Sequence, residues 1–192
     1  MAAQGACGLR RYCTEGVPLV SKVSVIFSSI ALWLLLGPPA ISAQDLSVRL
    51  ATPQGNSRVV ADFVGVTRWV LVNVWGARCP PCIEEMPELS SLHEDNQARG
   101  VTVLGIAIDF PSFGMAKRGE VQQFLDDYLI EFPVLLADQH KVSRVTGMRL
   151  RAVPSSFLYK PDGTLSKVWI GAVTQTQIEA YLAGADDRFR KP

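Results

Sequence analysis

Two cysteines, Cys79 and Cys82, stand two residues apart in the segment Cys-Pro-Pro-Cys. A buried strand is predicted directly before them and a helix directly after them, so the pair lies where a helix begins. Unpaired amide groups and the helix dipole at this end favour a thiolate on Cys79, which makes it the better nucleophile. Cys82, one turn further along, is placed to attack a mixed disulfide on Cys79. The pattern predicts thiol-disulfide exchange, and the two prolines should stiffen the turn and tune the reduction potential.

A Cys-x-x-Cys pair has other uses, among them half of a zinc site, a copper or iron site, and a structural disulfide. Zinc requires two more ligands, and the only histidines, His93 and His140, are expected to stand singly on helix surfaces. The strand-turn-helix context instead favours redox chemistry. A copper(I) carrier that uses the same two sulfurs stays open as the alternative function, and no resident metal or cofactor is expected.

The segments around the cysteines predict the unit that positions them. Residues 69–75 (WVLVNVW) are nearly all apolar, as in a strand buried on both faces of a sheet. After the motif, apolar residues recur every three positions from Ile83 to Leu92, along a helix that ends near Gly100. Residues 101–109 predict a second buried strand, which is parallel to the first and joined to it by a right-handed crossover.

The remaining segments predict an α/β domain without internal repeats. A hairpin is expected over residues 47–62, around the turn-forming residues 53–56. A second turn signature, from Lys160 to Gly163, joins two antiparallel strands. The other expected elements are helices at 120–128, 138–146 and 174–183, strands at 132–136, 155–159 and 164–170, and a loop at 110–119.

An apolar run without charge, residues 23–36, precedes this domain. Its 14 residues suit the core of a signal peptide, whereas a membrane-spanning helix needs roughly 20. Positive charge stands before the run at Arg10, Arg11 and Lys22, which places the domain after the run outside the cytoplasm. Cleavage after Ala43 and retention as a membrane anchor both stay open.

Composition and length limit the classes of partner and the number of domains. The 19 Lys and Arg residues nearly balance the 18 Asp and Glu residues, so no global field is available to hold nucleic acid. The 192 residues suffice for one ordinary domain with an appendage. We expect three parts: a cytoplasmic segment with the signal or anchor at 1–43, the domain at 44–185, and a tail at 186–192.

Four stretches together resemble the TlpA/ResA-like branch of the thioredoxin superfamily: VNVWGARCPPCIEEMPEL, VTVLGIAID, FPVLLAD and AVPSSFLYKPDGTL. The resemblance runs from Val70 to Leu182, about three fifths of the chain. It implies a thioredoxin-like three-layer fold with a central mixed sheet. It also implies a periplasmic or extracytoplasmic oxidoreductase, tethered or secreted. Such an enzyme reduces protein disulfides, among them those of apocytochrome c or copper-site proteins, and a membrane thiol donor reduces it in turn.

The same resemblance assigns roles to single residues. Cys79 matches the nucleophile, Cys82 the resolving thiol, and Pro154 the cis-proline that faces the disulfide. A peroxidase of the related peroxiredoxin group is not expected, because its single peroxidatic cysteine lies in a different sequence context. The expected substrate contacts are Trp75, Arg78 and Val153.

Glu85 is the expected proton acceptor for Cys82. Thioredoxin carries a buried aspartate at the place that corresponds to Asn73, and an amide cannot accept a proton. The family's alternative is a glutamate three residues after the second cysteine, here Glu85. Helical geometry puts Glu85 about 60° from Cys82 around the axis and Glu84 about 160° away. Burial is expected to raise the pKa of Glu85 toward the working pH, as a general base requires.

The chain departs from the family at Arg78, where an aromatic residue often precedes the first cysteine. A guanidinium beside Cys79 favours its thiolate, whereas an arginine directed into solvent leaves it unaffected, and the sequence leaves both open. Arg149 and Arg151, just before Pro154, are expected to form a small basic rim near the motif that selects partners.

Overall fold

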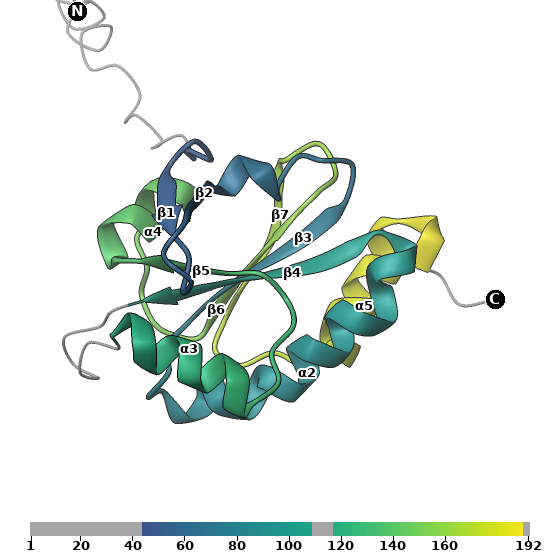
Figure 1. Cartoon of the computed structure of the whole chain (residues 1–192). Helices are drawn as coiled ribbons and strands as arrows, with labels where there is room; N and C mark the ends of the chain where they lie inside the picture. Colours follow the sequence, from purple (N-terminus) through teal and green to yellow (C-terminus); the bar gives the residue numbers. More distant parts are fainter. Residues whose placement is uncertain (1–43, 109–116, 190–192) are drawn as a thin grey trace, which may run out of the picture. The chain divides into compact units, whose positions relative to one another are not determined.

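The computed structural model describes residues 44–108 and 117–189. Expectations for the apolar run, for its cleavage and for most of the loop at 110–119 therefore lie outside the described residues. Seven strands form one mixed sheet in the order β2-β1-β5-β4-β3-β6-β7 (Figure 1). The strands are β1 (Arg49–Ala51), β2 (Ser57–Val59), β3 (Trp69–Trp75), β4 (Val101–Ile108), β5 (Val134–Ala137), β6 (Ser155–Tyr159) and β7 (Leu165–Ile170). The α-helices are α2 (Pro80–Asn96), α3 (Arg118–Asp127), α4 (Gln139–Thr146) and α5 (Gln175–Ala185), and the 3₁₀ turns are η1 (Val60–Asp62), η2 (Gln97–Arg99) and η4 (Asp187–Phe189).

Strand β3 lies inside the sheet, as its sequence predicts. It pairs in parallel with β4, where Trp69 faces Val101 and Trp75 faces Ala107. On its other side it pairs antiparallel with β6, and all seven of its residues are buried. Both expected hairpins are present, β1 with β2 and β6 with β7.

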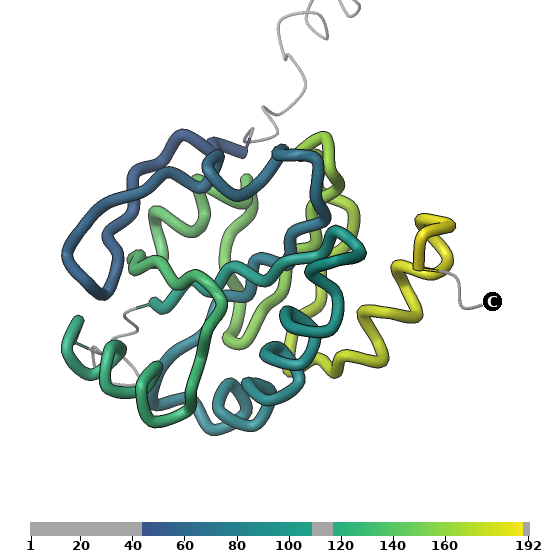
Figure 2. Tube along the Cα trace, turned by 45° about the vertical axis from the view of Figure 1, so that its right-hand side comes forward, coloured from purple at the N-terminus to yellow at the C-terminus, as the bar shows by residue number. Residues whose placement is uncertain are grey.

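Alternation along the strands divides the core between the two faces of the sheet. Leu71 and Trp75 point into a cluster with α2, α3 and α5, whereas Val70 and Val72 point into a second cluster with α4 and η1. Helix α5 lies beside α2 in both views (Figures 1 and 2). The three-layer thioredoxin-like fold with a central mixed sheet is confirmed.

Helix α2 begins directly at the cysteines. Cys79 has extended backbone angles and is the N-cap, and Pro80 and Pro81 take the first helical positions, where a backbone N–H has no partner within the helix. The helix ends at Asn96, and the chain turns back through η2 at Gly100, whose φ of 85° lies in the left-handed region. The Cys-Pro-Pro-Cys segment is thus held at the carboxyl end of β3.

The sequence predicts that His93 stands on the helix surface, and this prediction is wrong. Its side chain is only 7% exposed, and its Nδ1 accepts a hydrogen bond from the Val103 backbone N–H at 3.2 Å. The reason is helical spacing, because His93 follows Leu89 by four positions and shares its buried face. His140 is exposed, as expected.

The folded part of the chain extends beyond residue 185, the expected end of the domain. Phe189 is 3% exposed and belongs to the core cluster that contains α2 and α5. Asp186 accepts a hydrogen bond from Nε1 of Trp69 at 2.9 Å. Residues 186–189 are therefore part of the domain.

Within the described ranges, none of the helices combines the length and the apolar character needed to cross a membrane.

Candidate redox site

Cys79 and Cys82 form a disulfide at the start of α2. Both residues are buried in the core cluster, Cys79 with 1% and Cys82 with 0% exposure. Cys79 stands at the helix end and Cys82 in its first turn. The sequence-predicted pair is therefore joined, with Cys79 as the outer member.

The backbone around the disulfide leaves few N–H groups for a thiolate. Pro80 and Pro81 have no N–H, and the N–H groups of Cys82 and Ile83 both donate to the carbonyl oxygen of Cys79 at 3.0 Å. Direct amide bonds to a Cys79 thiolate are thus limited. The field of the helix dipole is the stabilisation that this backbone retains.

The loop before β6 brings Pro154 to the disulfide. The Val153–Pro154 peptide bond is cis, as the family resemblance implies. The carbonyl oxygen of Val153 lies 3.9 Å from Sγ of Cys79, and the Pro154 carbonyl accepts a bond from the Gly171 N–H at 2.9 Å. A partner that approaches Cys79 therefore meets the Val153–Pro154 segment as well.

Glu85 lies in the same first turns of α2 and is only 2% exposed. Its Oε1 accepts a hydrogen bond from Nδ2 of Asn73 at 2.9 Å, and its Oε2 accepts one from the Val173 N–H at 2.9 Å. Burial removes the carboxylate from water and raises its pKa to about 7, and the two hydrogen bonds oppose this rise. The carboxyl group is therefore able to exchange a proton near neutral pH.

From the sequence, Asn73 was considered only as the residue that replaces the buried aspartate of thioredoxin, and the contacts of its side chain were not predicted. Nδ2 of Asn73 donates both to Glu85 and to Oγ of Ser156, the latter at 3.0 Å. The Oδ1 atom of Asn73 is buried without a hydrogen-bond partner among the described residues. The amide group thus connects β3, α2 and β6 behind the disulfide.

The expected substrate contacts differ in their access to solvent. Arg78 forms an ion pair with Glu120 at 2.8 Å and is about half exposed. Of the two alternatives that the sequence leaves open for Arg78, this agrees with a side chain directed away from Cys79. Val153 is partly exposed. Trp75 is fully buried and its ring packs 4.9 Å from that of Phe124. Trp75 therefore supports the site from within and offers no surface to a docked protein in this state.

The residues expected to form the basic rim, Arg149 and Arg151, are both exposed. In the part of the chain that the structure describes, His, Cys, Asp and Glu form no group of three or more that is suited to hold a metal ion. The chemistry that the described side chains support rests on the two sulfurs, the cis-proline loop and one buried carboxyl group.

The chain matches the AhpC/TSA family over residues 40–168. It is 34% identical over 129 residues to the thiol-disulfide oxidoreductase ResA of Bacillus thuringiensis, a match that covers 67% of this chain and 69% of that protein. It is 27% identical over 146 residues to ResA of Halalkalibacterium halodurans, covering 72% and 78%. Its fold resembles that of a secreted Mycobacterium tuberculosis disulfide oxidoreductase homologous to E. coli DsbE, with a TM-score of 0.59, 24% identity, and coverage of 72% of this chain and 96% of that one.

Proposed function

Because the chain belongs to the AhpC/TSA family, and within the thioredoxin superfamily is a ResA-like thiol-disulfide oxidoreductase, we propose that it reduces disulfides of partner proteins outside the cytoplasm. One observation carries the proposal. The Cys79–Cys82 disulfide stands at a helix start beside the Val153 carbonyl, and the same helix carries a buried glutamate whose pKa is about 7.

In the first step, the reduced Cys79 thiolate attacks one sulfur of a partner disulfide. A bond forms between Cys79 and that sulfur, the partner's S–S bond breaks, and the other partner sulfur leaves as a thiolate that takes up a proton. The dipole of α2 stabilises the attacking thiolate. The cis segment at Val153 and Pro154 presents its backbone beside Cys79 to orient the partner chain.

In the second step, Cys82 resolves the mixed disulfide. The buried thiol transfers its proton to the Glu85 carboxylate, and the resulting thiolate attacks the sulfur of Cys79. The bond from Cys79 to the partner breaks, and the partner sulfur leaves as a thiolate that takes up a proton, so the partner is fully reduced. The enzyme is left with the Cys79–Cys82 disulfide, and a thiol donor in the membrane restores the two thiols.

The extracytoplasmic location and the membrane association belong to this proposal. Their support is the positive charge ahead of the apolar run at 23–36 and the secreted mycobacterial protein of similar fold. A reporter enzyme that is active only outside the cytoplasm is expected to work when fused after Ala43. Activity of a cytoplasmic reporter alone would contradict the location.

The proposed roles of the cysteines are tested by trapping. Cys82→Ser leaves the nucleophile but removes the resolving thiol, so mixed disulfides with partners, including apocytochrome c or copper-site proteins, should accumulate. Cys79→Ser is the matched control and should capture none. If Cys79→Ser captures partners as well as Cys82→Ser does, the two roles are reversed.

The direction of electron flow is tested by the reduction potential of the Cys79–Cys82 pair. A reductase requires a value nearer that of thioredoxin, about −270 mV, than that of a strong periplasmic oxidant, about −120 mV. Turnover of insulin disulfides should oxidise the pair stoichiometrically. Tight binding of one copper(I) ion with poor turnover would instead favour the copper carrier.

A further inference from the structure

A hollow with three arginines lies at the opposite end of the sheet from the disulfide. The disulfide follows the carboxyl end of β3, whereas the hollow is beside the amino ends of β3 and β4. Its volume is about 470 Å³, and no acidic residue is among its lining residues. These are Thr67, Arg68, Gln97, Ala98, Arg99, Gly100 and Arg188.

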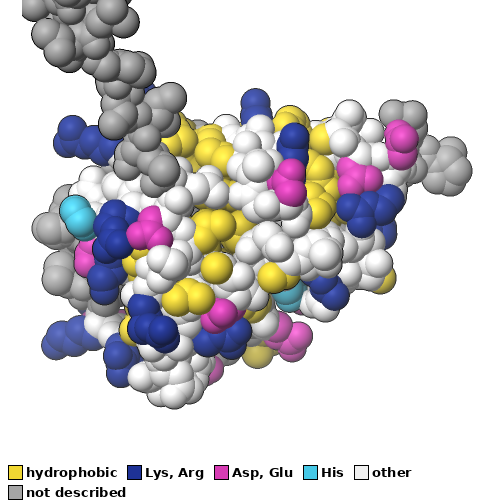
Figure 3. Space-filling view, turned by 90° about the horizontal axis from the view of Figure 1, so that it is seen from above, with side chains coloured by type: hydrophobic (Ala, Val, Ile, Leu, Met, Phe, Trp, Pro, Cys, Tyr) yellow, Lys and Arg dark blue, Asp and Glu magenta, His cyan; other side chains and the backbone are white. Residues whose placement is uncertain are grey.

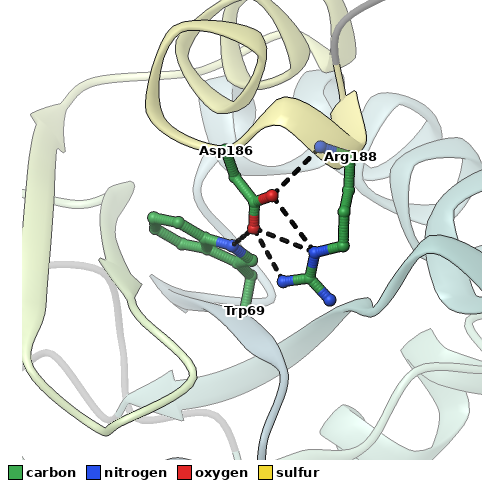
Figure 4. Close-up of polar contacts among 3 residues, drawn as sticks. All are labelled: Trp69, Asp186 and Arg188. Atoms are coloured by element: carbon green, nitrogen blue, oxygen red, sulfur yellow. Dashed lines mark hydrogen bonds and ion pairs between the residues drawn. The ribbon is translucent and has the colours of Figure 1, made fainter.

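Arg188 is held in place from outside the hollow. Its Nε and Nη2 atoms donate to the carboxylate of Asp186, with Nη2 at 2.7 Å, and the same carboxylate accepts a bond from Nε1 of the buried Trp69 (Figure 4). These bonds hold the pKa of Asp186 well below its usual range, so the anchor stays charged. The remaining nitrogen, Nη1, lies 3.4 Å from where a Cβ on Gly100 would stand, beside another residue that lines the hollow.

The other two arginines have different surroundings. The Arg99 guanidinium lies 4.9 Å above the ring of Phe189, and its Nε is buried without a hydrogen-bond partner among the described residues. Arg68 is exposed, and it forms none of the ion pairs found within the described ranges. An aromatic ring fixes a guanidinium without supplying a hydrogen-bond acceptor. Donors from three guanidinium groups therefore stand around one hollow with few acceptors.

The hollow is a local feature and not part of a broad basic surface. Figure 3 views the molecule from the end at which the described chain begins, and Lys and Arg side chains alternate there with Asp and Glu around an apolar area. A mixed face of this kind exerts little long-range attraction on polyanions. What distinguishes the hollow is the lack of carboxylates among its lining residues. It is therefore suited to one small anion.

We propose that this hollow binds a phosphate group. Guanidinium groups match the oxygens of phosphate through paired hydrogen bonds, and their positive charge attracts the negative charge of a phosphate monoester or diester. Ordinary carboxylates have fewer acceptor oxygens to satisfy donors from three directions. The group belongs either to a soluble phosphate compound or to the headgroup of a membrane lipid.

A membrane source is within reach of the chain. The turn from Lys160 to Gly163 contacts both the start of the domain, through Gln44 Nε2 and the Gly163 carbonyl at 3.0 Å, and the rim of the hollow, through the Thr67 N–H and the Pro161 carbonyl at 3.2 Å. Only eight positions separate Gln44 from Leu36, the end of the apolar run. Such a segment spans at most about 30 Å, so a run inserted in a bilayer would hold Gln44 within that distance of it.

The test uses the full chain in a nonionic detergent and inorganic phosphate as the probe, titrated calorimetrically at constant ionic strength. The wild type should bind one phosphate saturably. The double variant Arg68→Gln/Arg99→Gln should bind at least tenfold more weakly, because two of the three guanidinium groups are lost. The matched control Arg149→Gln/Arg151→Gln removes the same charge from exposed positions outside the hollow and should retain wild-type affinity. Unchanged thermal unfolding and unchanged insulin reduction would show that Arg68→Gln/Arg99→Gln remains folded.

A second arm distinguishes the two sources. Dihexanoyl phosphatidylglycerol, titrated against bound phosphate, should displace it if the site accepts a lipid phosphodiester, whereas dihexanoyl phosphatidylcholine controls for partition into detergent. Displacement that depends on Arg68 and Arg99 assigns the site to lipid headgroups, and saturable phosphate binding without displacement assigns it to soluble compounds. The proposal is overturned if phosphate binding does not saturate or if both double variants bind phosphate equally well.

Discussion

Asn73 donates a hydrogen bond across 2.9 Å to the carboxylate of Glu85, which links the middle of β3 to the second turn of α2. The bond favours the charged form of Glu85, while burial favours the neutral form more strongly, and the resulting pKa is about 7. Asn73 cannot itself accept a proton, but it adjusts how readily its neighbour does. In the proposed mechanism it is a positioning residue for the general base.

Asn73→Ala is expected to raise the pKa of Glu85 further, because it removes a donor to the carboxylate while burial persists. Resolution of the mixed disulfide at pH 7 should slow several-fold, and the rise of its rate with pH should move to higher pH. Stopped-flow exchange with a model disulfide across pH 6 to 9 measures both effects.

Ser156→Ala is the matched control for this variant. It removes the other acceptor of Asn73 Nδ2 and leaves the bond to Glu85 intact, so the pH profile should stay close to that of the wild type. If Asn73→Ala lowers the rate of resolution at every pH but leaves the midpoint of the pH profile unchanged, the role of Asn73 is structural only.

The elements around the cysteines could be predicted because their signals are local. The apolar residues 69–75 become β3 with the same bounds, and Asp138, which predicts a helix start, caps α4 by accepting from the Lys141 N–H at 2.8 Å. The capping residue Thr174 likewise begins α5. Each of these features depends on neighbouring residues, which a single sequence displays.

The contacts of Glu85 required the folded chain. Its second donor, the Val173 N–H, is 88 positions away and is a backbone group, which carries no sequence signature. The burial of His93 did have a signal, since it stands seven positions after Met86 and four after Leu89. Because histidine is polar, a sequence-based prediction places it on the surface unless its position relative to Met86 and Leu89 on the helix is taken into account.

Glu85 also predicts how stability depends on pH. Its pKa in the folded protein, about 7, lies above its ordinary value of 4.5. The folded state therefore binds a proton more tightly than the unfolded state does, and the stability that this confers is complete below pH 4.5 and lost as pH rises through 7. Urea unfolding of the oxidised protein at pH 5 and 8.5 should show a loss on the order of 3 kcal/mol.

Glu85→Gln should remove most of this loss, because an amide does not titrate. The variant keeps the side-chain shape, and Asn73 is able to turn its amide so that Oδ1, which is unpartnered in the structure, accepts from the new amide group. Equal dependence of stability on pH in Glu85→Gln and the wild type would show that another group is responsible.

His93 predicts a second dependence at acid pH. Burial lowers its pKa, and its Nδ1 must stay unprotonated to accept from the Val103 N–H. The stability that this bond provides is present above pH 6.5 and is lost as pH falls through the lowered pKa. Glu85 has the opposite effect on stability over the same range, so the test is made in the Glu85→Gln background. There His93→Gln should flatten the unfolding free energy between pH 7 and 5, whereas His140→Gln, at an exposed position, should keep the slope of the Glu85→Gln protein. A slope unchanged in His93→Gln would rule out this origin.

The last prediction concerns the proton that leaves Cys82. In the mixed disulfide this thiol is buried at the helix start, and on α2 the neighbouring carboxylates are those of Glu84, which is exposed, and Glu85, which is buried. Glu85→Gln keeps the shape and removes the acceptor, so resolution should slow by roughly 10- to 10⁴-fold, while the initial attack by Cys79 should change less. Stopped-flow exchange from pH 5 to 9 compares the wild type, Glu85→Gln and Glu84→Gln. Equal rates and profiles for the wild type and Glu85→Gln would remove Glu85 from the mechanism, and a loss confined to Glu84→Gln would place the base on the exposed face of the helix.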